Sequence, residues 1–114
     1  MPYIDVKLTR KIDSAACESL KCELGKAISL FPGKTESWLM CNIEDDKKMY
    51  HGGNNSSDCA FLEVKLFGTV DKKASDMFTR HICDYLDKKL EISPDRVYIR
   101  YEGGTDWGWN GSNF

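Results

Sequence analysis

Proline at position 2, directly after Met1, is the residue whose type and place could carry chemistry. Removal of Met1, which a small following residue permits, would turn Pro2 into a terminal secondary amine. Such an amine has an unperturbed pKa of about 7.7–8.0, and burial lowers that pKa by disfavouring the charged form. A neutral amine can take a proton from carbon and return it as a general base and acid. The alternative is that Pro2 only begins a strand, and taken alone it favours that interpretation.

Cysteine and histidine spacing does not indicate a metal site. The five cysteines are Cys17, Cys22, Cys41, Cys59 and Cys83, and the two histidines are His51 and His81. The cysteine count is odd, and no two cysteines form a C-x-x-C pair, whereas zinc sites and disulfide frameworks show paired spacing. We expect no metal and reduced thiols packed mostly in the core, with a redox role as the alternative. Both histidines are interpreted as structural or solvated.

The composition is that of an ordinary globular chain. With 114 residues, 41% hydrophobic and 30% charged, it predicts a single domain over residues 1–114. The net charge is -2 without a long block of either sign, which argues against nucleic-acid or polybasic membrane-surface binding. No apolar run reaches the roughly 18 residues that a membrane span needs. The first residues alternate polar and apolar, so we expect no signal peptide and a cytoplasmic protein.

The chain contains an internal repeat at an offset of 58 residues. Residues 3–8 (YIDVKL) recur as residues 61–66 (FLEVKL). Both runs alternate strictly, which predicts strands with one buried face. Ile4, Val6 and Leu8 would face the core in the first strand. Asp5 and Lys7, with Glu63 and Lys65 of the repeat, would lie on the second face.

A helical pattern follows each of these strands. Asp13 or Ser14 can cap the first helix, and Pro32 with Gly33 ends it. Its apolar positions are Cys17, Leu20, Leu24, Ala27, Ile28 and Phe31. The second helix is predicted over about 73–90, and Pro94 forbids its continuation. Its apolar face consists of Ala74, Met77, Phe78, Ile82, Tyr85 and Leu86.

Each helix leads to a further extended run, over residues 38–43 and 96–101. Both halves, about 2–57 and 58–114, therefore read strand, helix, strand. A crossover helix implies parallel strands within each half. The predicted fold is α/β (α+β), with two β-α-β units forming one four-stranded mixed sheet and both helices on one face. The stretch 45–58 reads as a surface loop, and the tryptophan-containing tail as a segment that docks onto something.

Several motifs together resemble the macrophage migration inhibitory factor family of the tautomerase superfamily. They are the initial Met-Pro, Gly33-Lys34 after the first helix, the Gly52-Gly53 loop, the string SPDRVYI at 93–99 and the tail WGWNGSNF at 107–114. The resemblance covers essentially the whole chain. It implies the tautomerase fold, a homotrimer with active sites between subunits, and cofactor-free keto–enol tautomerisation of phenylpyruvate and related α-keto acids or of D-dopachrome derivatives. Family members also act as leaderless secreted, cytokine-like proteins, so the alternative function is signalling through a cell-surface receptor.

The resemblance also assigns roles to individual residues. Pro2 would be the catalytic acid and base. Lys34 would hold the substrate carboxylate, and the backbone N–H of Phe67 would donate to it. Tyr98 would reach a neighbouring subunit's site and polarise the substrate carbonyl, although a strand tyrosine packed on a helix is the alternative. Trp38 and Trp107 match positions that form pocket walls in the family, whereas Trp109 looks structural in this context.

Three departures from the family pattern bear on the site. Arg100 stands where vertebrate members of the family usually have asparagine, so it would either bind a carboxylate bidentately or turn away as an exposed strand residue. Phe67 and Trp107 are bulkier than the aliphatic residues usual at these positions, which predicts a pocket that is narrower or more aromatic. Leu62 stands where the second cysteine of the family's C-x-x-C is found after Cys59, which argues against thiol–disulfide oxidoreductase activity.

Overall fold

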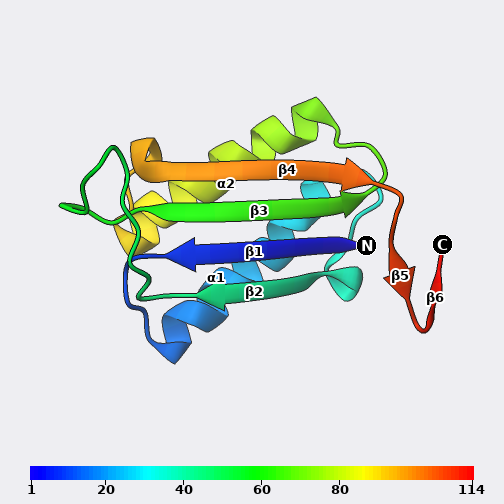
Figure 1. The fold of residues 1–114 in the computed structure, drawn as a ribbon, viewed down its shortest axis with the longest axis horizontal. Helices are drawn as coiled ribbons and strands as arrows, with labels where there is room; N and C mark the ends of the chain where they lie inside the picture. The colour runs from blue at the N-terminus through cyan, green and yellow to red at the C-terminus, as the bar shows by residue number, and fades with distance from the viewer.

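The computed structural model, which describes residues 1–114, contains two strand–helix–strand units (Figure 1). The first comprises β1 (Pro2–Leu8), α1 (Ser14–Ala27) and β2 (Met40–Glu44), and the second comprises β3 (Ala60–Phe67), α2 (Lys72–Leu90) and β4 (Val97–Gly104). The strand order is β2-β1-β3-β4, in which β1 and β3 are antiparallel and each outer strand runs parallel to its inner neighbour. Both helices cover the same face of the sheet. The predicted mixed sheet is thereby confirmed.

The two units share one register. Val6 pairs with Ile43 across β1 and β2, and Val64 pairs with Tyr101 across β3 and β4. Both members of the second pair lie 58 residues after those of the first. The helix caps repeat as well, since Asp13 accepts a hydrogen bond from Ala16 N and Asp71 accepts one from Ala74 N. The offset seen in the strand sequences therefore extends to backbone pairing.

The core lies between the helices and the helix-facing side of the sheet. Its strand members are the alternate residues Ile4, Val6, Leu8, Leu62, Val64 and Leu66, all essentially inaccessible to solvent. Leu20 and Leu24 of α1 and Phe78 and Ile82 of α2 close it from the other side. Burying each such side chain contributes about 1.5–3 kcal/mol to stability before the cost of ordering the chain. This layer fixes the strand ends that carry the candidate site.

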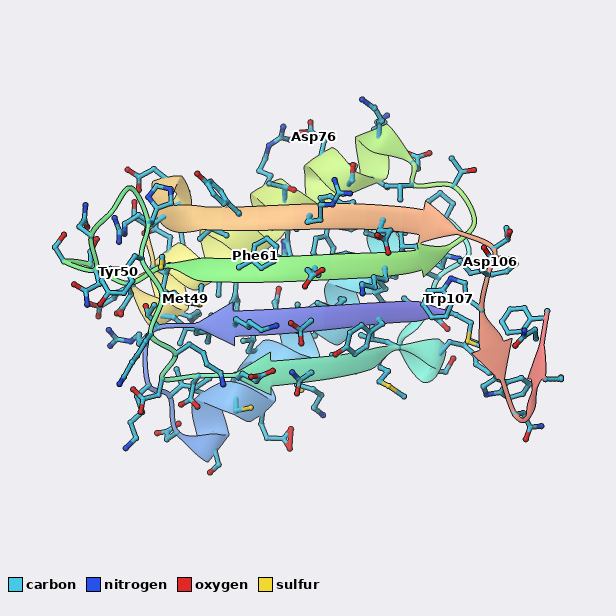
Figure 2. The ribbon with its side chains drawn as sticks, viewed as in Figure 1. Met49, Tyr50, Phe61, Asp76, Asp106 and Trp107 are labelled. Atoms are coloured by element: carbon cyan, nitrogen blue, oxygen red, sulfur yellow. The ribbon has the colours of Figure 1, made fainter.

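The second face of the sheet is open and carries the predicted charges. Asp5 is only 7% exposed, because Lys7 and the Asn42 side chain both donate hydrogen bonds to its carboxylate. Figure 2 labels Phe61 on β3, and this residue is the Cα partner of Lys7. A charged and aromatic surface of this kind is left without a covering layer in the single chain.

Three short 3-10 turns shift the boundaries that periodicity predicts. The first helix ends at Ala27, and a turn over Ile28–Leu30 replaces its expected last turn. The second extended run begins at Met40 instead of residue 38, because Glu36–Trp38 forms another turn. In that turn the Leu39 N–H donates to the Glu36 carbonyl instead of joining the sheet. The third turn, Pro94–Arg96, leads into β4.

Two side-chain predictions were wrong. Met77 of α2 is 41% exposed and lies off the buried stripe, which runs through Ala74, Phe78, Ile82, Leu86 and Leu90. The stripe keeps a spacing of four, and Met77 falls one position from Phe78, about 100° around the helix. All five cysteines are free, as expected, but only Cys59 is buried. Cys17, Cys41 and Cys83 are half-buried and Cys22 is exposed, because they lie at the rim of the helix layer or outside it.

The chain ends in a small hairpin beyond β4. β5 (Gly108–Trp109) pairs antiparallel with β6 (Ser112–Asn113) around Asn110 and Gly111, both with positive φ. Figure 1 shows this hairpin beside the end of the sheet where β1 begins. Neither helix is both long and apolar enough to cross a membrane.

Candidate functional site

Pro2 is buried at the first position of β1. Its Cα partner is Leu66 near the end of β3. Like Ile4, two residues further along the strand, Pro2 lies on the side of the sheet that faces the helices. Because proline has no N–H, it fits the first position of a strand without losing a ladder hydrogen bond. The rest of the candidate site is built around this end of the sheet.

Lys34 and Phe67 converge on the same end, although 33 residues separate them in sequence. Lys34 follows Gly33, whose φ of +76° turns the chain back after α1. The Lys34 ammonium Nζ donates to the Phe67 carbonyl at 2.8 Å and lies 5.9 Å from the centre of the Phe67 ring. It also borders a cavity of about 250 Å³, which Phe31, Pro32 and Leu66 help to line. A cation therefore stands beside the start of β1.

Met1 occupies the backbone donor that the resemblance assigns to substrate. The Phe67 N–H donates to the Met1 carbonyl at 3.0 Å. The terminal ammonium of Met1 is also perturbed: burial first, and then the positive charge of Lys34, lower its pKa below the ordinary value. This end of the sheet thus disfavours a protonated amine.

Aromatic side chains surround this end of the sheet. Trp38 packs edge-to-face on Trp109 with ring centroids 5.3 Å apart, and Phe67 packs on Phe114 at 5.2 Å. Trp107 lines a groove of about 400 Å³ beside Leu66 and Gly103, and Figure 2 shows it at the end of the sheet where β5 begins. These contacts show what the tail docks onto. Phe114 was not among the predicted site residues. The sequence feature that could have indicated it is its place as the last, aromatic residue of the tail motif at 107–114.

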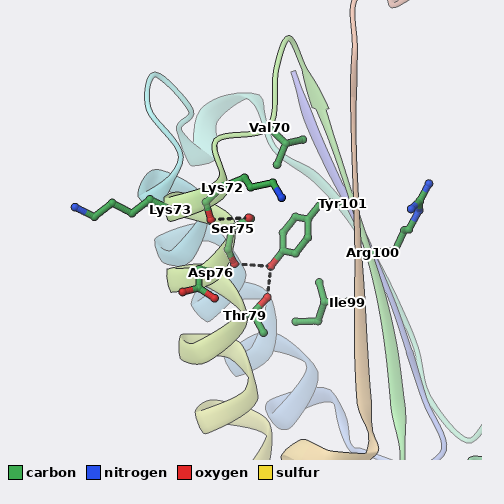
Figure 3. A pocket seen from close by; sticks show the side chains of 9 residues that line it. All are labelled: Val70, Lys72, Lys73, Ser75, Asp76, Thr79, Ile99, Arg100 and Tyr101. Atoms are coloured by element: carbon green, nitrogen blue, oxygen red, sulfur yellow. Dashed lines mark hydrogen bonds between the residues drawn. The ribbon is translucent and has the colours of Figure 1, made fainter.

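Tyr98 and Arg100 do not lie with Pro2 in the single chain. Tyr98 pairs with Phe61, five residues along β3 from Leu66, which places it about 16 Å from the Pro2 end. The Tyr98 side chain is 64% exposed. Arg100 is exposed as well, and Figure 3 shows its side chain pointing away from α2, toward the open face.

Tyr98 has an aromatic neighbour that the sequence did not indicate. The His51 ring packs edge-to-face on Tyr98 with centroids 5.2 Å apart. A groove of about 360 Å³ opens beside both residues and is lined by Phe61, Tyr50 and Lys7 among others. The other histidine, His81, hydrogen-bonds to Glu23 between the two helices. No group of three or more histidine, cysteine or acidic side chains is placed to hold a metal ion.

Comparison with known proteins assigns this chain to one family. The family model described as macrophage migration inhibitory factor (MIF) matches residues 1–114, and the chain belongs to this family. It is 30% identical over 103 residues to macrophage migration inhibitory factor of Meriones unguiculatus, covering 89% of each chain. It is 29% identical over 116 residues to the Xenopus laevis protein of the same name, covering 100% of this chain and 99% of the relative. The predicted family is confirmed.

Solved structures agree. The crystal structure of Leishmania major MIF2 superposes with a TM-score of 0.90 at 24% identity, covering 100% of this chain and 97% of that one. The macrophage migration inhibitory factor homologue from Prochlorococcus marinus gives a TM-score of 0.79 at 26% identity, with 98% of each chain covered. At 24% identity, the first of these similarities concerns the fold alone.

Proposed function

We propose that this chain is a cofactor-free keto–enol tautomerase that acts on phenylpyruvate or a related α-keto acid, with Pro2 as general acid and base. The observation that carries the proposal is the burial of Pro2 at the end of the sheet where Lys34 presents its ammonium group. Proton transfer between carbon and oxygen requires only an acid–base group and stabilisation of the enolate. Both can be supplied here by side chains and backbone.

The local electrostatics favour a neutral amine at Pro2. The amine of Met1, one residue further out, already has a lowered pKa because of burial and the charge of Lys34. After removal of Met1 the amine belongs to Pro2, which is more deeply buried than Met1. We expect the same two effects to lower the pKa of the Pro2 amine as well, relative to the usual value of about 7.7–8.0.

Removal of Met1 also prepares the carboxylate site. While Met1 is present, its carbonyl accepts the hydrogen bond of the Phe67 N–H. Loss of Met1 releases this donor next to the Lys34 ammonium. A substrate carboxylate can then take one hydrogen bond from each group, and charge-assisted hydrogen bonds of this kind are the stronger ones. One processing step therefore creates both the base and half of the binding site.

The proton path is simple. The neutral Pro2 amine removes a proton from the carbon next to the substrate carbonyl, and the electron pair moves onto the oxygen to give the enolate. The Pro2 ammonium formed in this step gives its proton to that oxygen, which completes the enol and restores the neutral amine, and ketonisation follows the reverse route. Lys34 stabilises the negative charge, while Trp38 and Trp107 form aromatic walls that narrow the pocket and limit water.

The site is completed by a neighbouring copy of the chain in a homotrimer. Tyr98 lies about 16 Å from the Pro2 end along the sheet, so it serves the Pro2 of another subunit. Its exposed hydroxyl would donate to the substrate carbonyl. Arg100 projects from the same open face and would add a second cation for a carboxylate.

The first test combines intact mass spectrometry with a phenylpyruvate ketonisation assay of the wild type and Pro2→Gly. We expect Met1 to be absent, wild-type turnover to be clear, and the variant to lose most of kcat while a thermal melt shows it folded. Retention of wild-type turnover by folded, processed Pro2→Gly would refute the proline mechanism. Processed wild type that turns over neither phenylpyruvate nor other aryl α-keto acids would refute the tautomerase itself.

Signalling is the second candidate function, because the curated relatives carry the name macrophage migration inhibitory factor. In this case the protein acts outside the cell and binds a cell-surface receptor through its assembled surface. Processed Pro2→Gly would then keep its effect on responding cells while losing turnover. A loss of both in folded protein would tie the effect to catalysis and count against a separate signalling surface.

A further inference from the structure

Two grooves on the helix side of the sheet are copies of each other. One has a volume of about 390 Å³ and lies between α1 and β2; the other has a volume of about 890 Å³ and lies between α2 and β4. Every residue that lines the first has a counterpart 58 positions later among those that line the second. Because equivalent positions line both grooves, the side chains at those positions decide what each groove can do.

In the second groove, a side chain spans from strand to helix. The Tyr101 hydroxyl of β4 donates to the Ser75 carbonyl at 3.0 Å and lies 2.7 Å from the Thr79 Oγ1, as Figure 3 shows. Strand and helix are therefore within reach of each other across the groove. Ile43 stands at the equivalent position of the first groove and has no polar atom in its side chain with which to make this link.

Two thiols line the first groove instead. Cys17 belongs to a single stripe of α1, since Ser14, Glu18 and Lys21 line the same groove at helical spacing. Cys41 approaches from the strand: it is the Cα partner of Ile4, shares its helix-facing side and packs against the core.

The electrostatics of the groove also couple the two sulfurs. Burial raises the pKa of the Cys41 thiol, Lys21 acts to lower it, and negative charge on Cys17 raises it further. The equivalent positions in the second groove are Ser75 and Ile99, which are chemically inert toward oxidants.

We propose that Cys17 and Cys41 form a dithiol site that a hydroperoxide oxidises to an intrachain disulfide. The Cys17 thiolate attacks one peroxide oxygen, the O–O bond breaks, and an alcohol or water leaves, which gives a sulfenic acid on Cys17. The Cys41 sulfur then attacks the Cys17 sulfur, and the hydroxide leaves as water with the Cys41 proton. Two thiols are oxidised and one peroxide is reduced.

The disulfide supplies in the first half the strand-to-helix link that Tyr101 supplies in the second. β2 is an edge strand paired only with β1, so it can adjust to the span of the bond. It begins two residues after Trp38, which lies at the Pro2 end of the sheet. The site is independent of the proposed tautomerase chemistry, because it uses neither Pro2 nor Lys34.

The test treats the reduced, full-length protein with limiting hydrogen peroxide, quenches it with iodoacetamide and maps peptides without reduction. We expect the mass of the single chain to fall by that of two hydrogens and a linked peptide pair to contain Cys17 and Cys41. Dithiothreitol should reverse both changes. Cys22→Ser and Cys83→Ser serve as matched controls and should form the same bond. Cys17→Ser and Cys41→Ser should not.

A second measurement needs no variant. Dibromobimane bridges two neighbouring thiols and becomes strongly fluorescent when both have reacted, so the native wild type should give a fluorescent adduct on the Cys17 and Cys41 peptides. No bridged adduct in the folded protein would overturn the proposal. A peroxide-induced bond that joins other cysteines, or thiols that are oxidised only to sulfinic acid, would overturn it as well.

Discussion

Replacement of Tyr101 by phenylalanine should destabilise the protein at neutral pH. The change removes the hydroxyl that bonds to the Ser75 carbonyl and to Thr79, but it keeps the ring that packs near Phe31 and Phe78 at centroid distances of 6.0 and 6.1 Å. Each hydrogen bond contributes about 0.5–1.5 kcal/mol net. We therefore expect the loss of two such bonds to lower the free energy of unfolding by about 1–3 kcal/mol.

The same substitution should become less costly as the pH rises. Burial raises the pKa of Tyr101 from the ordinary value of 10.0 to about 12. At a pH above the pKa that Tyr101 has in the unfolded chain, the unfolded chain releases the hydroxyl proton while the folded chain keeps it. The free energy of unfolding therefore falls until the pH passes the higher pKa of Tyr101 in the folded chain. A pKa difference of this size between the folded and the unfolded chain is equivalent to about 2.7 kcal/mol of stability. Solvent screening at this half-buried side chain reduces the expected loss of stability to about 1–2 kcal/mol. Tyr101→Phe lacks this titration, so the difference between the two proteins should shrink toward zero.

Urea unfolding of both proteins, followed by circular dichroism from neutral pH through the alkaline range, measures this difference directly. Other lysines and tyrosines titrate in both proteins and cancel. Tyr50→Phe, at a side chain that is 67% exposed, is the matched control and should leave the profile unchanged. A stability difference between wild type and Tyr101→Phe that stays constant over the whole pH range would refute the reasoning.

Three further outcomes are expected. Gly103→Ala should lower the melting temperature strongly, because the added Cβ would lie 2.4 Å from a backbone carbonyl oxygen. The added Cβ of Gly25→Ala meets only a flexible glutamate side chain, so this variant should be neutral or stabilised by up to about 1 kcal/mol. Equal melting temperatures of the two variants would contradict this. For Asp5, burial alone would raise the pKa, but hydrogen bonds from lysine and asparagine lower it on balance. Its stabilisation is present above the usual carboxyl pKa and is lost as the pH falls through the lowered one, so Asp5→Asn should flatten the acid unfolding profile, and an unchanged profile would count against the network. Lys34→Ala should raise KM for phenylpyruvate about 10- to 100-fold, the equivalent of about 1.4–2.7 kcal/mol, and an unchanged KM would remove Lys34 from the carboxylate site.

The local structure followed from the sequence wherever a period was clear. Strict alternation placed Ile4 and Val6 on the buried face, and spacing of three and four residues found Leu20 and Leu24. The helix ends were less accurate, because the same residues can continue an α-helix or tighten into a 3-10 turn, as at Ile28–Leu30. Propensity differs little between those two outcomes, and packing of Phe31 into the core decides between them.

Motif spacing, read through the family resemblance, indicated the site residues, but it could not show which of them meet in one chain. The contact between Lys34 and the Phe67 carbonyl, and the hydrogen bond between Phe67 and Met1, depend on long-range strand order. The separation of Tyr98 from Pro2 depends on it too. Nothing in either local sequence specifies that β1 lies between β2 and β3.

The sequence by itself therefore indicated the four sheet strands and the two helices, most of their buried faces, the internal repeat and the family. Only the tertiary structure decided that Met1 occupies the Phe67 donor, that the tail packs its aromatic rings onto Trp38 and Phe67, and that Cys17 and Cys41 share a groove. The physical reason is that periodicity shows which residues of one segment face the core and which face water, and this depends only on residues that are neighbours in the sequence. Contacts between segments arise from the register and order in which those buried faces pack together, and that arrangement is a property of the whole chain.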